Sequence, residues 1–264
     1  MEIGVSTASL FMRATNEEAL GILNDVDARV VEIFLESFSE YKSEFISSLK
    51  DKLGNLKVHS LHTLTTQFEP QIFSENPIAR GDAFDFMKGI CRGGKEIGAK
   101  NYTLHGKAYF KKNVVFNDFP LYIRCFNELC ELCGGYGVDI CLENVSWAFY
   151  NAPGWFSNVK EKCPKLKACF DIKQARNSGF AAEEYIKEMS GRISTVHLSD
   201  INEKGKMVLP GRGVVDFRKL FIELDKAKFC GNMLIEVYKD DYESVDEIAD
   251  SLAYLRKIKD EVFN

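Results

Sequence analysis

Positive charge, long apolar runs and histidine are all scarce in this chain. Its 34 lysines and arginines are fewer than its 39 aspartates and glutamates, so the 264 residues carry a formal net charge of −5. Such a balance argues against a broad binding surface for a polyanion such as nucleic acid. The chain starts with an acid, Glu2, where a signal peptide needs basic residues, and no long apolar run comes after it. We therefore expect a cytoplasmic protein.

Two common binding motifs are also missing. Cys130 and Cys133 are the only close pair among eight cysteines, and a zinc site built on such pairs would need a second one. We interpret all eight as reduced cysteines of the core. No G-x-G-x-x-G follows the first strand-like run, which disfavours a dinucleotide-binding fold.

Short strand-like runs alternate with longer helical segments along the whole chain, without a linker or a low-complexity tract. Eight strands are predicted, at residues 3–7, 30–35, 56–62, 101–105, 138–143, 166–171, 193–198 and 233–238. Helix signals lie between them, such as a capping box at Thr15–Glu18 and an N-cap followed by proline at Asn76–Pro77. This alternation implies a parallel sheet of the α/β class. Eight units in one domain, residues 1–264, favour a single closed (β/α)₈ TIM barrel over an open sheet.

Polar side chains end six of the predicted strands: His62, His105, Glu143, Asp171, His197 and Glu236. Active sites of such barrels lie at the C-terminal ends of the strands. The residues two positions before these ends are mostly small, as a narrow barrel interior requires. We therefore predict that the six side chains point together into the barrel mouth. His59 has the opposite parity, and we expect it to be structural.

Carboxylates gathered at a barrel mouth repel each other and lose hydration, so they need a cation or protons. Three carboxylates and a neutral imidazole make a mostly oxygen-donor site. Such a site suits one divalent ion, Mn²⁺, Mg²⁺ or Co²⁺, and also admits Zn²⁺. The alternative is that the carboxylates only cap their strands and pair with Lys107, Lys173 or Lys239. The convergence of four strand ends favours the metal.

The residues around these strand ends resemble the xylose isomerase-like TIM barrels, a family of sugar isomerases and epimerases that also contains the endonuclease IV type of apurinic endonuclease. The resemblance covers nearly the whole chain, and it is most specific at Leu142–Asn144, Phe170–Ile172, Val196–Asp200, Pro210–Gly213 with Asp216–Phe217, and Ile235–Val237. It implies that Glu143, Asp171, His197 and Glu236 bind one divalent metal ion. It also implies that Glu143 and Glu236 move a substrate proton through a metal-stabilised enediolate.

We accordingly expect a metal-dependent sugar or sugar-phosphate isomerase or epimerase of carbohydrate metabolism. The substrate contacts that we expect are His62, His105, Gln174 and Arg212. Free and phosphorylated sugars both stay open, and specificity is expected in the loops at residues 63–76 and 106–117. No oligomeric state and no membrane partner is predicted.

Three alternative functions compete with the isomerase. A dehydratase acting on a keto-inositol would use the same metal-assisted chemistry to eliminate water. A barrel that binds sugar without catalysis would differ from both enzymes, because mutating the two glutamates would then have no effect in the cell. An endonuclease IV-like hydrolase on abasic DNA is the least favoured. Gln174 stands where many relatives carry a histidine, Gly211–Gly213 stands about where an Asp-x-His pair would be needed, and four histidines are too few for a three-zinc cluster.

Overall fold

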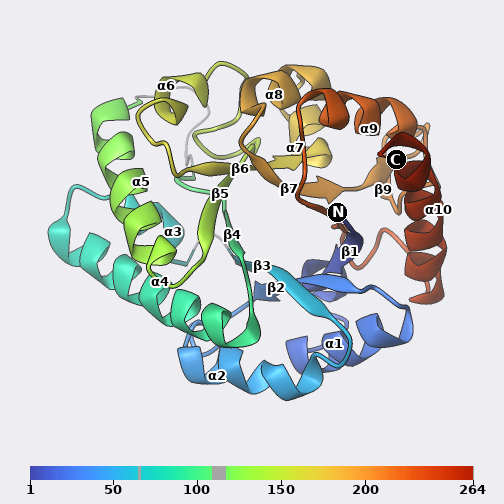
Figure 1. Cartoon of the computed structure of the whole chain (residues 1–264), viewed down its shortest axis with the longest axis horizontal. Coiled ribbons are helices and arrows are strands. Elements are labelled where there is room, and N and C mark those ends of the chain that lie inside the picture. Colours follow the sequence, from blue (N-terminus) through green and yellow to red (C-terminus); the bar gives the residue numbers. More distant parts are fainter. Residues whose placement is uncertain (65–66, 109–116, 264) are drawn as a thin grey trace.

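The computed structural model describes residues 1–64, 67–108 and 117–263. Figure 1 shows them as a ring of strands enclosed by helices. Eight parallel strands close the ring in the order β1-β10-β7-β6-β5-β4-β3-β2, which confirms the predicted (β/α)₈ barrel. Their bounds are β1 (Ile3–Ser6), β2 (Val30–Leu35), β3 (Lys57–Thr63), β4 (Asn101–Leu104), β5 (Asp139–Glu143), β6 (Lys167–Asp171), β7 (Ile193–Leu198) and β10 (Asn232–Ile235).

The helices follow the strands along the chain and cover the outside of the barrel (Figure 1). The predicted capping box closes between Thr15 and Glu18, and the Asn76 side chain caps the helix that Pro77 opens. The helices are η1 (Thr7–Leu10), α1 (Asn16–Asp25), α2 (Ser43–Ser48), η2 (Leu49–Lys52), α3 (Glu69–Ile72), α4 (Pro77–Ile97), α5 (Phe119–Gly134), α6 (Ser157–Lys160), α7 (Ile172–Asn177), α8 (Ala182–Met189), α9 (Phe217–Lys226) and α10 (Asp246–Val262). Within the described residues none is both long and apolar enough to cross a membrane.

The strands separate an apolar outer layer from a polar interior. Side chains of one parity, including Leu104, Leu142, Phe170, Val196 and Ile235, are fully buried in the hydrophobic core, as expected where strands meet covering helices. The opposite parity carries the small and polar side chains that the barrel interior needs. All eight cysteines are free, and seven of them are buried whereas Cys230 is exposed.

His59 lies near the start of β3, at the end of the barrel opposite the mouth. Its Nε2 is 2.9 Å from the Thr195 hydroxyl, and its Nδ1 is 3.0 Å from the side-chain nitrogen of Asn232. Burial lowers the pKa of this histidine to about 4, although Glu32 opposes that effect. The ring is thus a partnered core group, in agreement with the structural role expected for it.

A short hairpin that the sequence pattern did not predict follows β7. Strands β8 (Asp200–Ile201) and β9 (Met207–Val208) pair antiparallel. The carboxylate of Asp200 accepts hydrogen bonds from the backbone amides of Ile201, Gly211, Gly213 and Val215. A Cβ atom at Gly213 would lie 2.2 Å from the Ile201 carbonyl oxygen. The glycine-rich turn therefore serves to wrap the chain tightly around Asp200.

Candidate metal centre and active site

Four side chains from neighbouring strands meet at the mouth of the barrel. Asp171 and His197 are register partners on β6 and β7, and Glu236 follows β10, where Leu234 pairs with His197. Together with Glu143 they offer ligand atoms that all lie within 4.8 Å of one another. All four predicted metal ligands are buried, so the structure brings the complete set together.

The imidazole of His197 is at the centre of this group. Its Nδ1 lies 3.3 Å from Glu236 Oε2, 3.4 Å from Glu143 Oε1 and 3.8 Å from Asp171 Oδ2. Among the described residues, Nδ1 itself, Glu143 Oε2 and Asp171 Oδ2 have no hydrogen-bond partner. Burying a polar atom without a hydrogen-bond partner lowers the stability of the fold. A divalent cation would satisfy these atoms at once, so the donor set fits a metal ion with mixed oxygen and nitrogen ligands.

The pKa shifts of Asp171 and His197 both favour the protonated, more positive form of the four-residue cluster. Burial raises the pKa of Asp171 to about 7, even though the nearby Lys173 ammonium opposes the shift. Burial alone would lower the pKa of His197, but Cys169, Glu236 and Glu32 raise it well above its usual range. Protons thus occupy positions that a metal would take over, because metal ligands must release their protons on binding.

Glu32 on β2 holds His197 from behind. Its Oε1 lies 3.1 Å from His197 Nε2, and its Oε2 accepts hydrogen bonds from the hydroxyls of Ser60 and Thr103. Burial alone would raise the pKa of Glu32, but His197 holds it down at about 2. An ionised carboxylate facing Nε2 favours the tautomer with the proton on Nε2. Once a metal displaces the proton from Nδ1, its lone pair is directed at the metal site, which is the usual support for a ligating histidine.

A second buried carboxylate, Glu69 on α3, holds His105. Its Oε2 accepts hydrogen bonds from the backbone amides of His105 and Gly106 and lies 3.6 Å from His105 Nδ1. Its Oε1 accepts from the hydroxyls of Tyr102 and Thr63. On the other side of the ring, His105 Nε2 is 3.3 Å from Glu143 Oε2. His105 thus connects a buried carboxylate to Glu143, one of the candidate metal ligands.

His62 lies beside this pair with a fixed tautomer. Its Nδ1 is 2.9 Å from the Thr103 carbonyl oxygen, and because a carbonyl only accepts, Nδ1 carries the proton. Its Nε2 is therefore the acceptor, 4.0 Å from Glu143 Oε2. Burial and the neighbouring His105 lower the pKa of His62, which keeps the ring neutral. His62, His105 and Glu143 also form a set of possible ligand atoms within 4.8 Å of one another.

A cavity of about 180 Å³ opens at the four candidate metal ligands, two of which, Glu143 and Glu236, line it. His62, His105, Glu143, Gln174 and Glu236 form its polar part, and its apolar wall consists of Ala8, Phe11, Phe34, Leu64, Trp147 and Tyr238, with Lys173 between the two. The Gln174 carbonyl oxygen accepts hydrogen bonds from the amide and hydroxyl of Ser146, so its amide nitrogen is the end that can donate to a ligand. This volume suits a small molecule.

The sequence model of a family described as "Xylose isomerase-like TIM barrel" matches residues 20–258. The chain belongs to this family. Among curated proteins it resembles the inosose dehydratase of Histophilus somni (strain 129Pt), with 25% identity over 184 residues that cover 59% of this chain and 61% of that protein. The match therefore spans only about three fifths of the relative's length.

Two solved structures have a similar fold along nearly their full length. The D-psicose 3-epimerase from Clostridium cellulolyticum H10, with D-tagatose, is 14% identical with a TM-score of 0.80 and covers 98% of this chain and 99% of that chain. The IOLI protein with a binding zinc atom is 16% identical with a TM-score of 0.81 and covers 100% of both chains. At these identities the likeness shows the fold alone.

Arg212, which the sequence pattern suggested as a substrate contact, is not brought to the cavity. Its guanidinium forms ion pairs with Glu247 and Asp250, at 3.2 Å each, on α10. The turn that carries it is shaped by the hydrogen bonds to Asp200. Within this xylose isomerase-like barrel, the glycine-rich motif is therefore a structural support of the β7 loop.

The expected specificity loops are described only in part. Residues 65–66 of the first and 109–116 of the second lie outside the described residues. The first loop contains α3, which supplies Glu69, and the sequence pattern did not indicate this role. Lys107, in the second loop, lines a separate hollow with Asp118 and Tyr122. Of the lysines considered as partners of the carboxylates, Lys173 pairs with Glu236 and Asp171.

Proposed function

We propose that this protein is a metal-dependent isomerase or epimerase that acts on a sugar or sugar phosphate. The observation that carries the proposal is the position of Glu143 and Glu236. Their carboxylates approach His197 Nδ1 at 3.4 and 3.3 Å, and both line the small cavity at the mouth. Two carboxylates that face one small cavity can remove and return a proton.

The proposed roles of the side chains divide into proton transfer, charge stabilisation and orientation. One of the two glutamates takes the proton from the carbon between a hydroxyl and a carbonyl group, and the other returns a proton, so that the product is an isomer of the substrate. A divalent ion held by Glu143, Asp171, His197 and Glu236 would offset the negative charge that develops on the substrate oxygens. His62, His105 and Gln174 orient the hydroxyl groups.

A second candidate is supported by the named relatives. The matching curated proteins are called inosose dehydratases, so a lyase that removes water from a keto-inositol is the alternative reaction. Loss of a proton next to a carbonyl is the first step in both reactions. The second step distinguishes them, because the lyase expels a hydroxyl group as water whereas the epimerase returns a proton.

The test is proton exchange in D₂O. The protein is loaded in turn with Mn²⁺, Co²⁺, Mg²⁺ and Zn²⁺ and incubated with ketoses, ketose phosphates and keto-inositols. Carbon-bound deuterium in products of unchanged composition supports the isomerase, and loss of water supports the dehydratase. Glu143→Gln and Glu236→Gln should each slow product formation by at least about 100-fold at saturating metal, because each variant lacks one of the two proton-transfer groups. Glu247→Gln, on α10 and not among the described residues that line the cavity, should not. Failure to bind any divalent ion, or product formation that survives in both glutamine variants, would refute the proposal.

A further inference from the structure

We propose that Lys173 binds an anionic oxygen of the substrate and is a further functional residue of this site. The inference rests on the proposed function, because it assigns a partner to the negative charge that develops when the proton leaves. The sequence pattern indicated Lys173 as a possible counter-ion of the carboxylates, and the family resemblance assigned it no role.

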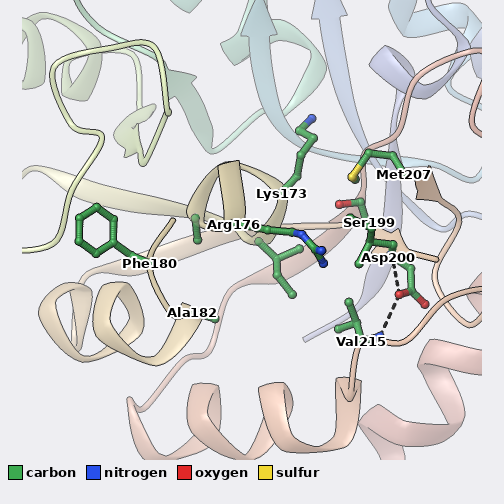
Figure 2. A pocket seen from close by; sticks show the side chains of 11 residues that line it. Lys173, Arg176, Phe180, Ala182, Ser199, Asp200, Met207 and Val215 are labelled. Carbon is green, nitrogen blue, oxygen red and sulfur yellow. Dashed lines mark hydrogen bonds between the residues drawn. The ribbon is translucent and has the colours of Figure 1, made fainter. Parts of the chain in front are cut away.

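Lys173 is brought to the mouth by the sharp start of α7. The helix begins directly after the metal ligand Asp171, whose side chain caps it by accepting a hydrogen bond from the Gln174 amide. Figure 2 shows the Lys173 side chain extending away from Arg176 and Asp200. Lys173 lines a cavity of about 170 Å³ together with Arg176 and Asp200. Lys173 also lines the cavity at the barrel mouth that contains Glu143 and Glu236. The side chain therefore passes between the two hollows.

The ammonium group is buried and has a donor to spare. Lys173 is 5% exposed, and its Nζ lies 3.2 Å from Glu236 Oε2, 3.8 Å from Asp171 Oδ2 and 4.6 Å from the centre of the Tyr238 ring. An ammonium has three N–H donors. Glu236 Oε2 accepts one hydrogen bond from Lys173, and the Tyr238 hydroxyl is a second partner. This leaves a donor for a ligand, and Lys173 lines the same cavity as Glu143 and Glu236.

Charge complementarity points to an anionic oxygen as the occupant. The three ligand carboxylates carry −3, whereas a divalent ion and the Lys173 ammonium together carry +3. Lysine thus balances the charge of the ligand set itself, although the ionised Glu32 behind His197 adds a further negative charge. Without Lys173, a substrate that gains negative charge would meet a site that is one charge more negative. Once a metal shares the charge of Glu236, the ammonium can turn its free donor toward the substrate. A charge-assisted hydrogen bond of this kind contributes about 10- to 100-fold in affinity.

Oxalate binding to the Mn²⁺-loaded protein tests this assignment. Oxalate presents two adjacent oxygens in a planar anion, as the enediolate of a hydroxyketone does, although it carries one more negative charge. We expect Lys173→Met to weaken oxalate binding at least tenfold by calorimetry, and Lys173→Arg, which keeps the charge, to recover most of the loss. Lys239→Met is the matched control, because Lys239 lies three residues after Glu236 but is not among the described residues that line the cavity. It should leave the oxalate affinity unchanged.

The measurement separates this inference from its rivals. Mn²⁺ affinity is determined first for every variant, and oxalate is then titrated at saturating Mn²⁺. If Lys173 is only a counter-ion, Lys173→Met will change the Mn²⁺ affinity and leave the oxalate affinity intact, and that result would overturn the inference. A wild-type protein that binds Mn²⁺ but not oxalate would overturn it as well. A wild-type protein that binds no Mn²⁺ would instead refute the proposed function. Lys173→Gln replaces Lys173→Met if the latter does not fold.

Discussion

Replacing Glu32 by glutamine should weaken metal binding although Glu32 is not itself a metal ligand. The variant keeps the size of the side chain and removes its charge. The Glu32 carboxylate faces His197 Nε2 at 3.1 Å and is held by Ser60 and Thr103. A glutamine can turn its amide nitrogen toward His197 or toward the two hydroxyls. In the first orientation it can no longer accept the Nε2 proton, so the imidazole loses the group that keeps Nδ1 directed at the cluster.

The size of the effect can be estimated from the role of the carboxylate. The pKa of Glu32 falls from 4.5 to about 2 although burial opposes the fall, because His197 stabilises the ionised form. Loss of the group behind a ligating histidine typically weakens metal binding about 10- to 100-fold. We therefore expect Glu32→Gln to raise the metal dissociation constant by about that factor.

The assay is competition of the protein with a chelator for Co²⁺, whose visible absorption also reports the coordination geometry. It is run at about pH 8.5, because Glu32 also favours the protonated imidazole and high pH reduces that opposing effect. Ser60→Ala is the control, since it removes one hydrogen bond to Glu32 but keeps the carboxylate, and it should change Co²⁺ affinity less than threefold. If Glu32→Gln also binds Co²⁺ within threefold of the wild type with an unchanged spectrum, the positioning argument is wrong.

Three further predictions concern the same cluster. In metal-free protein, Asp171 has its pKa raised from 3.8 to about 7, so the unfolded state ionises first and this residue contributes a fall in stability of about 4 kcal/mol as pH rises through that window. His59, whose pKa is lowered to about 4, contributes in the opposite direction over part of the same window, so the test is a comparison of proteins. Urea unfolding should show that stability falls less, or rises more, with pH in Asp171→Asn and with saturating Mn²⁺ than in the metal-free wild type, and an equal pH dependence in all three contradicts the prediction. Glu69→Gln should lower the free energy of unfolding by about 1–3 kcal/mol and should reduce turnover, because His105 loses the carboxylate that positions it. The Mn²⁺ affinity measured by calorimetry should stay within threefold of the wild type. A large loss of Mn²⁺ affinity would instead show that Glu69 supports metal binding. Glu143→Gln and Glu236→Gln should each slow product formation at saturating metal by about 10²- to 10⁴-fold. An unaffected rate in either variant removes that glutamate from proton transfer.

The barrel and the convergence of the four candidate metal ligands could be predicted because both depend on short-range patterns. Strands of a parallel barrel bury one face against helices and end at a common rim, so residues that end successive strands must be neighbours in space. The convergence of Glu143, Asp171, His197 and Glu236 can be inferred from that rule without any knowledge of the loops. The helices predicted by capping signals, such as the one after Asn76, begin where local chemistry places them.

The residues that the sequence pattern did not reveal depend on contacts between distant parts of the chain. Glu32 stands alone in the apolar strand Val30–Leu35, and a buried acid in such a run is a signal that could have been used. Glu69 gives no such signal, because its four-residue helix lies in a stretch predicted as loop. The position of Arg212 was equally hidden, since its turn is set by the hydrogen bonds to Asp200 and by the approach of α10.

Two histidines at the barrel mouth each lie against a buried carboxylate from another element. These carboxylates fix the directions of the imidazole rings beside the four candidate metal ligands. Glu32 backs His197 and Glu69 backs His105, so the imidazoles are held in fixed directions. The ligand atoms they face, Glu143 Oε2 and Asp171 Oδ2, have no hydrogen-bond partner among the described residues. Rigid support of a set of unsatisfied ligand atoms is what a preorganised cation site requires. Binding a divalent ion should therefore raise the stability of the barrel mouth more than that of the opposite end, where His59 is already partnered. Both ends can be followed on β3 by measuring amide hydrogen exchange with and without Mn²⁺, and Mn²⁺ should slow the exchange near His62 more than the exchange near His59.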